Sequence, residues 1–322
     1  MTVSATTSLD PANDARFRRW AAYASVSVAL ILICAKIFAF VTSNSVGVLV
    51  SLLDSFLDLL ASSIILLSVM YAQRPADRSH RFGHGKAEPL AALAQAGFIA
   101  GSAIFVAIET LKRVIDPQPV GPTTPAIATL VFSIVLTGAL VAWQSWVAKR
   151  TGSVAIQADR ANYAGDALMT LAIIAALVLT DMTGTSGFDS GLAAIAILYW
   201  LWNAWKIGYH AFHLLLDHEQ PAETRDKIIE IVTAHNHADD IHDLRTRSDG
   251  STLFIEFHLE MDGDMTIVEA HHVTDALEAD LMSAFPNAEI IIHQEPAGID
   301  DERLDTRLGV DSRQGSLFGD AG

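Results

Sequence analysis

The sequence predicts an α-helical membrane protein with six transmembrane helices, followed by a cytoplasmic α+β domain. Two observations carry this prediction. The 322-residue chain is 51% hydrophobic and only 18% charged, and its mean hydropathy of +0.33 is too apolar for a soluble enzyme of this length. The formal charge of -16 is also unevenly placed, because 24 acidic residues stand against 7 basic ones from His218 onward.

The composition also restricts the ligands. An acidic domain lacks the basic face that a nucleic-acid partner needs, so no nucleic acid is expected. Ten of the 12 histidines lie between His210 and His293, which makes a metal ion the more natural ligand. Cys34 is the single cysteine, so a disulfide within the chain is excluded.

Six apolar segments have the length of a membrane span. They lie at 20–42, 46–71, 88–112, 123–147, 155–180 and 188–214. Two of the loops between them are rich in basic residues, namely Arg74, Arg78, Arg81 and Lys86 in one and Lys149 and Arg150 in the other. By the positive-inside rule these loops and both termini are cytoplasmic. We expect a flexible tail at 1–15 and a transmembrane domain at 16–216.

A soluble domain is predicted at 217–296, with the element order α-β-β-α-β. Helices are expected at 221–235 and 266–284, and strands at 240–247, 252–261 and 288–294. Asp249 and Gly250 form a hairpin signal between the first two strands. Asp264 is expected to cap the second helix. The acidic residues 297–322 are expected to be a disordered tail.

Two apolar spans carry paired polar residues. Asp54 and Asp58 are four residues apart in the second span, and Asn162 and Asp166 repeat this spacing in the fifth, so each pair lies on one helix face. An intramembrane carboxylate costs about 2.5–3.5 kcal/mol on insertion scales and needs a cation or a proton. The four side chains could form one oxygen-ligand site for a divalent cation. Interhelical hydrogen bonds or a proton relay without metal are the alternative.

A second candidate site lies in the loop after the second span. Asp77, His80 and His84 offer one carboxylate and two imidazoles, a reasonable set of zinc-type ligands. A solvated polar loop would contain the same residue types, so the spacing alone leaves both readings open.

The soluble domain holds a third set of possible ligands on several of its elements. The set comprises His242, His258, His271, Asp275, His293 and Glu295. His258 lies on the polar face of an alternating strand, while His271 and Asp275 are one helical turn apart. We expect these side chains to converge on metal. Surface histidines without a role are the alternative, and that description suits His235, His237 and His272 better.

Taken together, these motifs resemble the cation diffusion facilitator family, most closely its bacterial zinc/iron exporter branch. The resemblance covers about 15–296 and rests on the paired polar residues of two spans and on three short segments. Those segments are Ser79-His80-Arg81-Phe82-Gly83-His84-Gly85-Lys86-Ala87-Glu88, His242-Asp243-Leu244-Arg245 and Ile292-His293-Gln294. It implies a homodimeric antiporter in the bacterial inner membrane that exports divalent metal in exchange for protons. It also implies a metallochaperone-like soluble domain.

Position by position, the resemblance assigns the four intramembrane residues to transport, the loop cluster to a second site and the soluble cluster to regulation. It further implies that Lys86 and Asp217 form a salt bridge that locks the dimer. Two positions depart from the zinc exporters of this branch. Asn162 stands where they usually have His, and Glu295 where they usually have Asp.

The asparagine changes the expected cargo. An all-oxygen site favours manganese, magnesium or calcium, whereas imidazole favours zinc, and Asn162 resembles the manganese-exporting subgroups. We therefore expect proton-coupled efflux of Mn²⁺, with a broader Zn²⁺, Fe²⁺, Cd²⁺ or Co²⁺ exporter as the alternative. Metal ions are substrate and regulatory ligands, with no prosthetic group. A membrane metal sensor that does not transport is the rival class. An enzyme is not expected, because no nucleophile or base motif accompanies the ligands.

Overall fold

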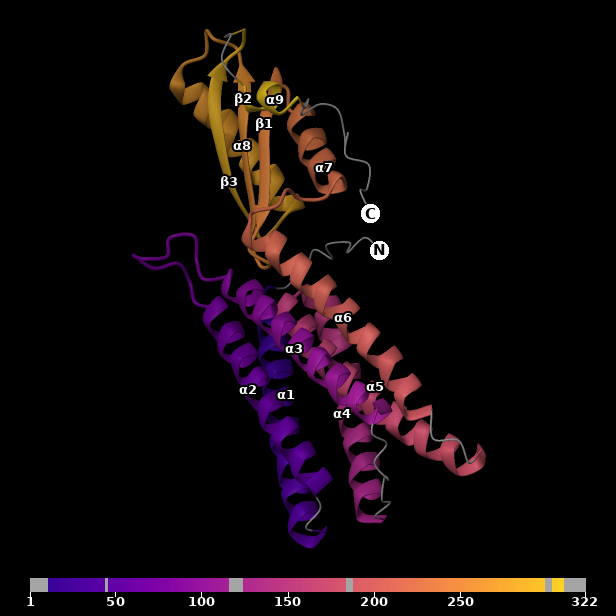
Figure 1. Cartoon of the computed structure of the whole chain (residues 1–322). Coiled ribbons are helices and arrows are strands. Elements are labelled where there is room, and N and C mark those ends of the chain that lie inside the picture. The colour runs from indigo at the N-terminus through magenta and orange to yellow at the C-terminus, as the bar shows by residue number, and fades with distance from the viewer. Residues whose placement is uncertain (1–10, 44–45, 116–123, 184–187, 299–302, 310–322) are drawn as a thin grey trace. The chain divides into compact units, whose positions relative to one another are not determined.

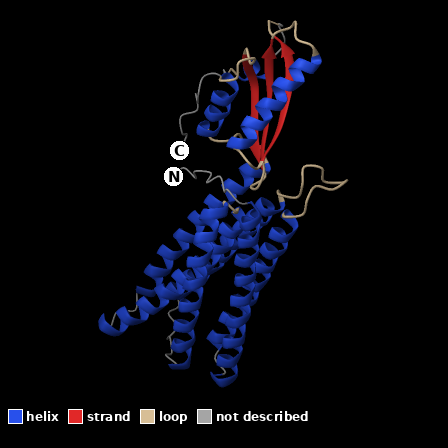
Figure 2. Cartoon of the chain, turned by 180° about the vertical axis from the view of Figure 1, so that it is seen from behind, coloured by secondary structure: helices blue, strands red, loops and turns tan. Residues whose placement is uncertain are grey.

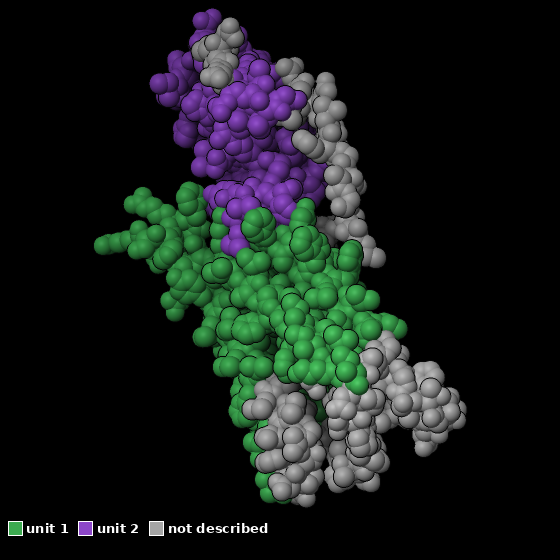
Figure 3. Space-filling view, viewed as in Figure 1, with its two compact units in different colours: residues 1–212 green, residues 213–322 purple. Residues whose placement is uncertain are grey.

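The computed structural model describes residues 11–43, 46–115, 124–183, 188–298 and 303–309, drawn in Figure 1. The chain divides into two compact units, 1–212 and 213–322, coloured separately in Figure 3. In the described residues the regular secondary structure of the first unit is all helical, whereas the second unit also contains the strands (Figure 2). The two units are described separately below.

Long helices make up the first unit. They are α1 (Pro11–Ser43), α2 (Val46–Ala72), α3 (Ala87–Ile115), α4 (Thr124–Thr151), α5 (Val154–Thr183) and α6 (Phe188–Leu215). Part of the segment expected to be a flexible tail is therefore helical, because α1 begins at Pro11. The buried carboxylate of Asp14 secures this first turn by pairing with Arg150 of α4, at 3.0 Å from Nε to Oδ1.

Four stretches of the described residues are long and apolar enough to cross a membrane. They are Asn13–Phe38, Ser55–Ala72, Ala87–Lys112 and Val131–Thr151. The predicted spans at 155–180 and 188–214 are not among them, and both contain side chains outside the described part of the structure. Six membrane crossings therefore stay a prediction.

Small residues let the helices of the first unit approach one another closely. One buried cluster contains side chains from each of the five helices α1, α2, α3, α4 and α5. Its members are Ala21, Ala22, Ile65, Val69, Ala91, Val147, Ala148, Ala155 and Ile156. Large apolar side chains instead face outward, among them Phe105, Trp202 and Trp205, each at least two-thirds exposed. Such an inverted distribution of small and large apolar residues suits a helix bundle surrounded by lipid.

The second unit contains α7 (Ala222–Thr233), β1 (Asp240–Ser248), β2 (Leu253–Met261), α8 (Ile267–Ala284), β3 (Ala288–Pro296) and α9 (Leu304–Leu308). Its strands form one sheet in the order β1-β2-β3, with β1 antiparallel and β3 parallel to β2. The expected hairpin joins β1 and β2, and Gly250 takes a positive φ of 96° in its turn. The parallel pair requires a crossover, which α8 provides.

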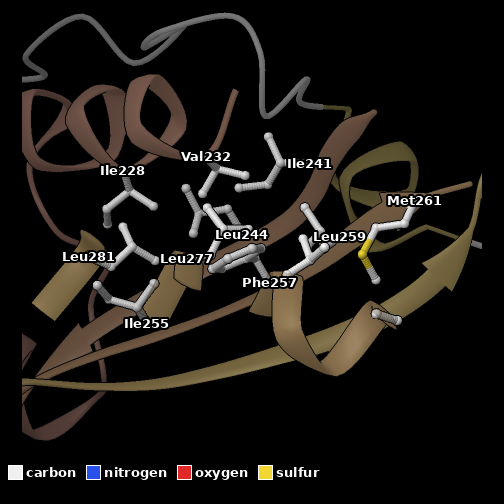
Figure 4. Close-up of a cluster of buried hydrophobic side chains, with 12 residues drawn as sticks. Ile228, Val232, Ile241, Leu244, Ile255, Phe257, Leu259, Met261, Leu277 and Leu281 are labelled. Atoms are coloured by element: carbon white, nitrogen blue, oxygen red, sulfur yellow. The ribbon is translucent and has the colours of Figure 1, made fainter. Parts of the chain in front are cut away.

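The apolar core of this unit lies between one sheet face and the helices α7 and α8 (Figure 4). Ile228 and Val232 come from α7, Phe257 from β2, and Leu277 and Leu281 from α8, all nearly inaccessible. Because side chains alternate along a strand, burying Ile255, Phe257 and Leu259 of β2 turns His258 and Glu260 toward the opposite face. The core thereby fixes which side chains remain available for a polar site.

Two local predictions differ from the structure. Thr266, and not Asp264, caps α8: its hydroxyl accepts from the Glu269 backbone N–H while the Glu269 carboxylate accepts from the Thr266 backbone N–H. Only Thr266 has a glutamate at the required third position of the helix. The tail expected to be disordered includes α9, which is held by two reciprocal hydrogen bonds of 2.9 Å: the backbone N–H of Asp243 donates to the Asp305 carboxylate, and the backbone N–H of Asp305 donates to the Asp243 carboxylate.

Candidate metal centres

The polar pairs of α2 and α5 meet inside the helical unit. Nδ2 of Asn162 on α5 donates to Oδ1 of Asp58 on α2 at 2.9 Å, and to Oδ2 of Asp166 one turn along α5 at 3.4 Å. All three side chains are half-buried. The amide thus links two carboxylates from different helices. Asp54 lies one turn before Asp58 in α2, but its side chain is outside the described residues.

A close helix approach borders this cluster. A Cβ at Gly165 would lie 1.3 Å from Nε1 of Trp200 on α6. Glycine therefore permits the buried indole of Trp200 to lie against α5 immediately before Asp166. The sequence shows this glycine, but its role requires knowledge of which α6 residue faces it.

The loop cluster is also assembled. Oδ1 of Asp77 lies 3.4 Å from Nδ1 of His80, and Oδ2 lies 3.3 Å from Nε2 of His84. Asp77 is exposed, whereas His84 is buried with its ring against Tyr71. Backbone N–H groups of His80 and Ser79 donate to Asp77 and lower its pKa. The carboxylate is therefore anionic wherever the imidazoles are neutral, which is the protonation state that metal ligands need.

Strand register builds the third cluster. His242 of β1 stands opposite His258 of β2, and His258 stands opposite His293 of β3. Glu295, two residues along β3, reaches both central histidines: Oε1 lies 2.6 Å from Nδ1 of His258, and Oε2 lies 3.3 Å from Nε2 of His242. Donor atoms of His242, His258 and Glu295 all lie within 4.8 Å of one another.

His242 is the unusual member of this cluster. Its side chain is only 4% exposed, and neither ring nitrogen makes a hydrogen bond. Carboxylate oxygens of Glu260 and Glu295 nevertheless lie 3.4 and 3.3 Å from its two nitrogens. A neutral imidazole has one nitrogen lone pair, which such an oxygen would repel. A cation bound at the unprotonated nitrogen would offset this repulsion.

The remaining soluble-domain ligands separate into two groups. His293 borders the sheet cluster, with Nε2 3.4 Å from Oε1 of Glu295, and is exposed. His271 and Asp275 instead form their own exposed pair on α8 at 3.5 Å, and they are not part of the group formed by His242, His258 and Glu295. In this chain the helical pair stays apart from the sheet residues, so the convergence of all six stays a prediction. The sheet residues follow strand register, which α8 does not share.

The expected salt bridge involves residues of both units. Asp217 takes a positive φ of 56° and lies 3.6 Å from Nη1 of Arg247 in its own unit. Lys86 precedes α3 in the other unit. Their pairing stays a prediction.

Sequence reasoning missed Glu260. Its carboxylate lies beside His242 and also accepts from Arg303. The sequence contains a signal for it, because Glu260 is two residues from His258 and therefore lies on the same polar face of β2. Arg303 could not be anticipated, since α9 falls in the segment expected to be disordered.

Two family models together match most of the chain. The chain matches the family described as "Cation efflux transmembrane domain" over 22–216 and "Cation efflux protein, cytoplasmic domain" over 220–297. It is 42% identical to the cation-efflux pump FieF of Escherichia fergusonii over 279 residues, covering 87% of this chain and 93% of that protein. The same identity relates it to FieF of Cronobacter sakazakii over 280 residues, with the same coverage.

A solved structure is also similar to part of this chain. It is the metal-bound C-terminal domain of the CzcD transporter from Thermotoga maritima, 28% identical over 24% of this chain and 93% of that one, with a TM-score of 0.24.

The matches to a cation-efflux transmembrane domain and to a cation-efflux cytoplasmic domain define this chain as an integral membrane cation-efflux transporter. This chain belongs to the cation diffusion facilitator family.

Proposed function

We propose that this transporter exports Mn²⁺ from the cytoplasm in exchange for protons, through a site formed by Asp54, Asp58, Asn162 and Asp166. The observation that carries the proposal is the Asn162 amide between the carboxylates of Asp58 and Asp166 on two helices. Every ligand atom that these side chains can offer a cation is an oxygen. Such a set favours Mn²⁺ over Zn²⁺ more than a set containing imidazole would.

The amide of Asn162 has two uses in this mechanism. Without cargo, Nδ2 donates to both carboxylates and reduces the repulsion between them. When the cation enters, rotation of the amide turns Oδ1 inward, so the same side chain becomes a neutral oxygen ligand. Binding therefore exchanges two hydrogen bonds for direct coordination without displacing either helix.

Protons return by competing for the same carboxylates. Asp54, Asp58 and Asp166 lose their cationic partner when the metal leaves, and closely spaced carboxylates then favour proton binding. Asn162 cannot titrate, so no imidazole contributes a group that titrates near neutrality. Alternating access to the two sides of the membrane converts this competition into exchange.

The histidine-containing clusters would serve regulation. Asp77, His80 and His84 form the loop site, while His242, His258, His293 and Glu295 form the main soluble-domain site, with His271 and Asp275 as a separate pair. In a homodimer, metal would draw the two acidic soluble domains together by offsetting their repulsion, with Lys86 and Asp217 pairing near the membrane. The proposal places six spans in the bacterial inner membrane with both termini in the cytoplasm.

The test is uptake of Mn²⁺ and Zn²⁺ into proteoliposomes of the full chain, with and without a proton gradient. Asn162→His should shift the Mn²⁺-to-Zn²⁺ rate ratio toward zinc by about tenfold, equivalent to ~1.4 kcal/mol. Asn203→His is the matched control, because Asn203 lies on α6 and donates to the backbone of its own helix.

Equal rates for the two metals in the wild-type protein would overturn the manganese assignment and leave a broader divalent exporter. Flux that ignores the proton gradient would overturn exchange. Binding without flux of either metal would indicate the sensor.

A further inference from the structure

A fully buried acid lies in the helical unit outside the proposed cation site. Asp159 of α5 is completely inaccessible. Its Oδ1 accepts from the hydroxyl of Ser62 on α2 at 3.0 Å, and its Oδ2 accepts from Nε2 of Gln144 on α4 at 2.7 Å and from the hydroxyl of Ser25 on α1. These three donors are also buried. Four helices therefore meet at one carboxylate.

This carboxylate differs from the other buried acids of the unit. Asp14 lies 3.0 Å from Arg150, and Glu88 lies 3.2 Å from Arg18. The hydrogen-bond partners of Asp159 are all neutral. A buried charge without a cationic partner is costly in a protein interior and more so in a membrane. Binding a proton removes that cost.

The groups facing Asp159 can support both protonation states. Nε2 of Gln144 donates to the carboxylate, while Oε1 of the same amide is buried without a hydrogen-bond partner. Rotation of the amide would present Oε1 to a protonated Asp159 as an acceptor. The separations from the carboxylate oxygens to Ser62 and Gln144 are those of hydrogen bonds.

The hydroxyl of Tyr163 extends this cluster. The Tyr163 hydroxyl is 2.9 Å from that of Ser62 and 3.3 Å from the backbone oxygen of Ser25. Tyr163 follows Asn162 in α5, and Ser62 is one turn from Asp58 in α2. The titratable groups facing the cluster are Tyr163 and, beyond it, Asp58 and Asp166, while α1 and α4 present Ser25 and Gln144.

We propose that Asp159 is a proton-binding site of the transport cycle, separate from the residues that bind the cation. The carboxyl O–H bond breaks when a cation binds between α2 and α5, and the proton passes to solvent; Gln144 then changes from acceptor to donor, so that the carboxylate has three donors. When cation leaves, a proton from solvent binds Asp159 again, and Gln144 changes from donor to acceptor. This inference rests on the proposed exchange mechanism.

Asp159→Asn separates the two roles that Asp159 could have. The variant retains a polar side chain of the same size, and its amide can use the unpartnered Oε1 of Gln144, but it cannot release a proton. Proton release per bound Mn²⁺, measured with a pH dye on the full chain in nanodiscs, should fall by about one relative to the wild type. The slope of log Kd against pH should flatten by the same amount. Asp14→Asn is the control, and its proton count should remain that of the wild type.

A second measurement covers the case in which Asp159→Asn does not fold. Infrared difference spectra of the wild-type protein should show loss of a protonated carboxyl band on adding Mn²⁺, and Ser62→Ala should shift that band because Oδ1 loses a donor. An unshifted band in Ser62→Ala, or an unchanged proton count in a folded Asp159→Asn, would overturn the assignment to Asp159. Proton-independent flux in the wild type would instead overturn the proposed exchange itself.

Discussion

The two units of the chain bring their candidate metal ligands together in different ways. In the helical unit, Asp58, Asn162 and Asp166 come together because helical spacing aligns them and α2 lies beside α5. In the soluble unit, His242, His258 and Glu295 come together through strand register. The first cluster offers only oxygen ligands, whereas the second also offers imidazole nitrogen. We infer that the helical unit selects the cation and that the sheet responds to a softer range of metals.

The largest expected effect tests the helical side of this comparison. Asp58→Ala removes a carboxylate that the amide of Asn162 contacts at 2.9 Å, and it should reduce Mn²⁺ uptake into proteoliposomes by a factor on the order of 100, or ~2.7 kcal/mol. Asp280→Ala, which removes an exposed acid on α8, should retain uptake. If Asp58→Ala kept an uptake that depends on pH, the cation would cross the membrane at another site.

A smaller effect is expected on the sheet side. His258→Ala removes the central imidazole of its cluster and should weaken Zn²⁺ binding to the full chain by about tenfold, or ~1.4 kcal/mol, measured by calorimetry. The Mn²⁺-to-Zn²⁺ transport ratio should stay at its wild-type value. His272→Ala is the matched control, because His272 is exposed outside the cluster. A changed ratio in His258→Ala would mean that the soluble unit takes part in selection.

In both units the sequence predicted those features of the candidate sites that follow from the periodicity of a single helix or strand. Helical spacing predicted that Asn162 shares a helix face with Asp166, and that Asp58 shares one with Asp54. Strand alternation predicted that His258 lies on the polar face of β2. The partners of Asp159 could not be predicted this way, since Ser25, Ser62 and Gln144 come from three other helices. Each is an ordinary polar residue in its own apolar segment, and only the packing makes them donors to one carboxylate.

Backbone conformation hid a second group of contacts. Asp243 takes a positive φ of 53° at a β-bulge after His242, and this conformation turns its carboxylate toward the N–H groups of Leu304 and Asp305. Neither strand alternation nor composition indicates such a bulge. An acidic segment was consequently expected to be disordered where α9 forms.

The contact between α9 and β1 gives the next prediction. Asp305→Ala removes the acceptor of the Asp243 N–H and should cost roughly 1–2 kcal/mol of local stability, seen as faster amide hydrogen exchange in α9. Asp262→Ala, which lies outside this contact, should leave that exchange unchanged. Exchange in α9 that is equally fast in the wild type would contradict the reciprocal hydrogen bonds.

This contact should also weaken in acid. Burial alone raises the pKa of Asp243, but the backbone N–H groups of Asp305 and Leu304 outweigh it and lower the pKa below its ordinary value. A carboxyl with a lowered folded-state pKa stabilises the fold above its unfolded-state pKa, and this contribution disappears as pH falls through the folded value. The protection of the α9 amides, measured against the exchange rates of an unstructured peptide at the same pH, should therefore fall below about pH 4. Acid should have no such effect in Asp243→Asn.

The smallest effect concerns the start of α8, which supports the crossover between β2 and β3. Thr266→Ala removes the capping hydroxyl and should lower the Tm of the soluble unit by a few degrees, roughly 2–4 °C. Hydrogen bonds from Thr266 lower the pKa of Glu269, so their stabilising effect is present at neutral pH and is lost on acidification. The Tm difference between Thr266→Ala and the wild type should therefore shrink in acid.

Mn²⁺ uptake by Thr266→Ala should not change, because the cap supports the histidine-bearing sheet and contributes nothing to the oxygen ligands of α2 and α5. A loss of uptake as large as that of Asp58→Ala would mean that the two units do not divide selection and response as we infer.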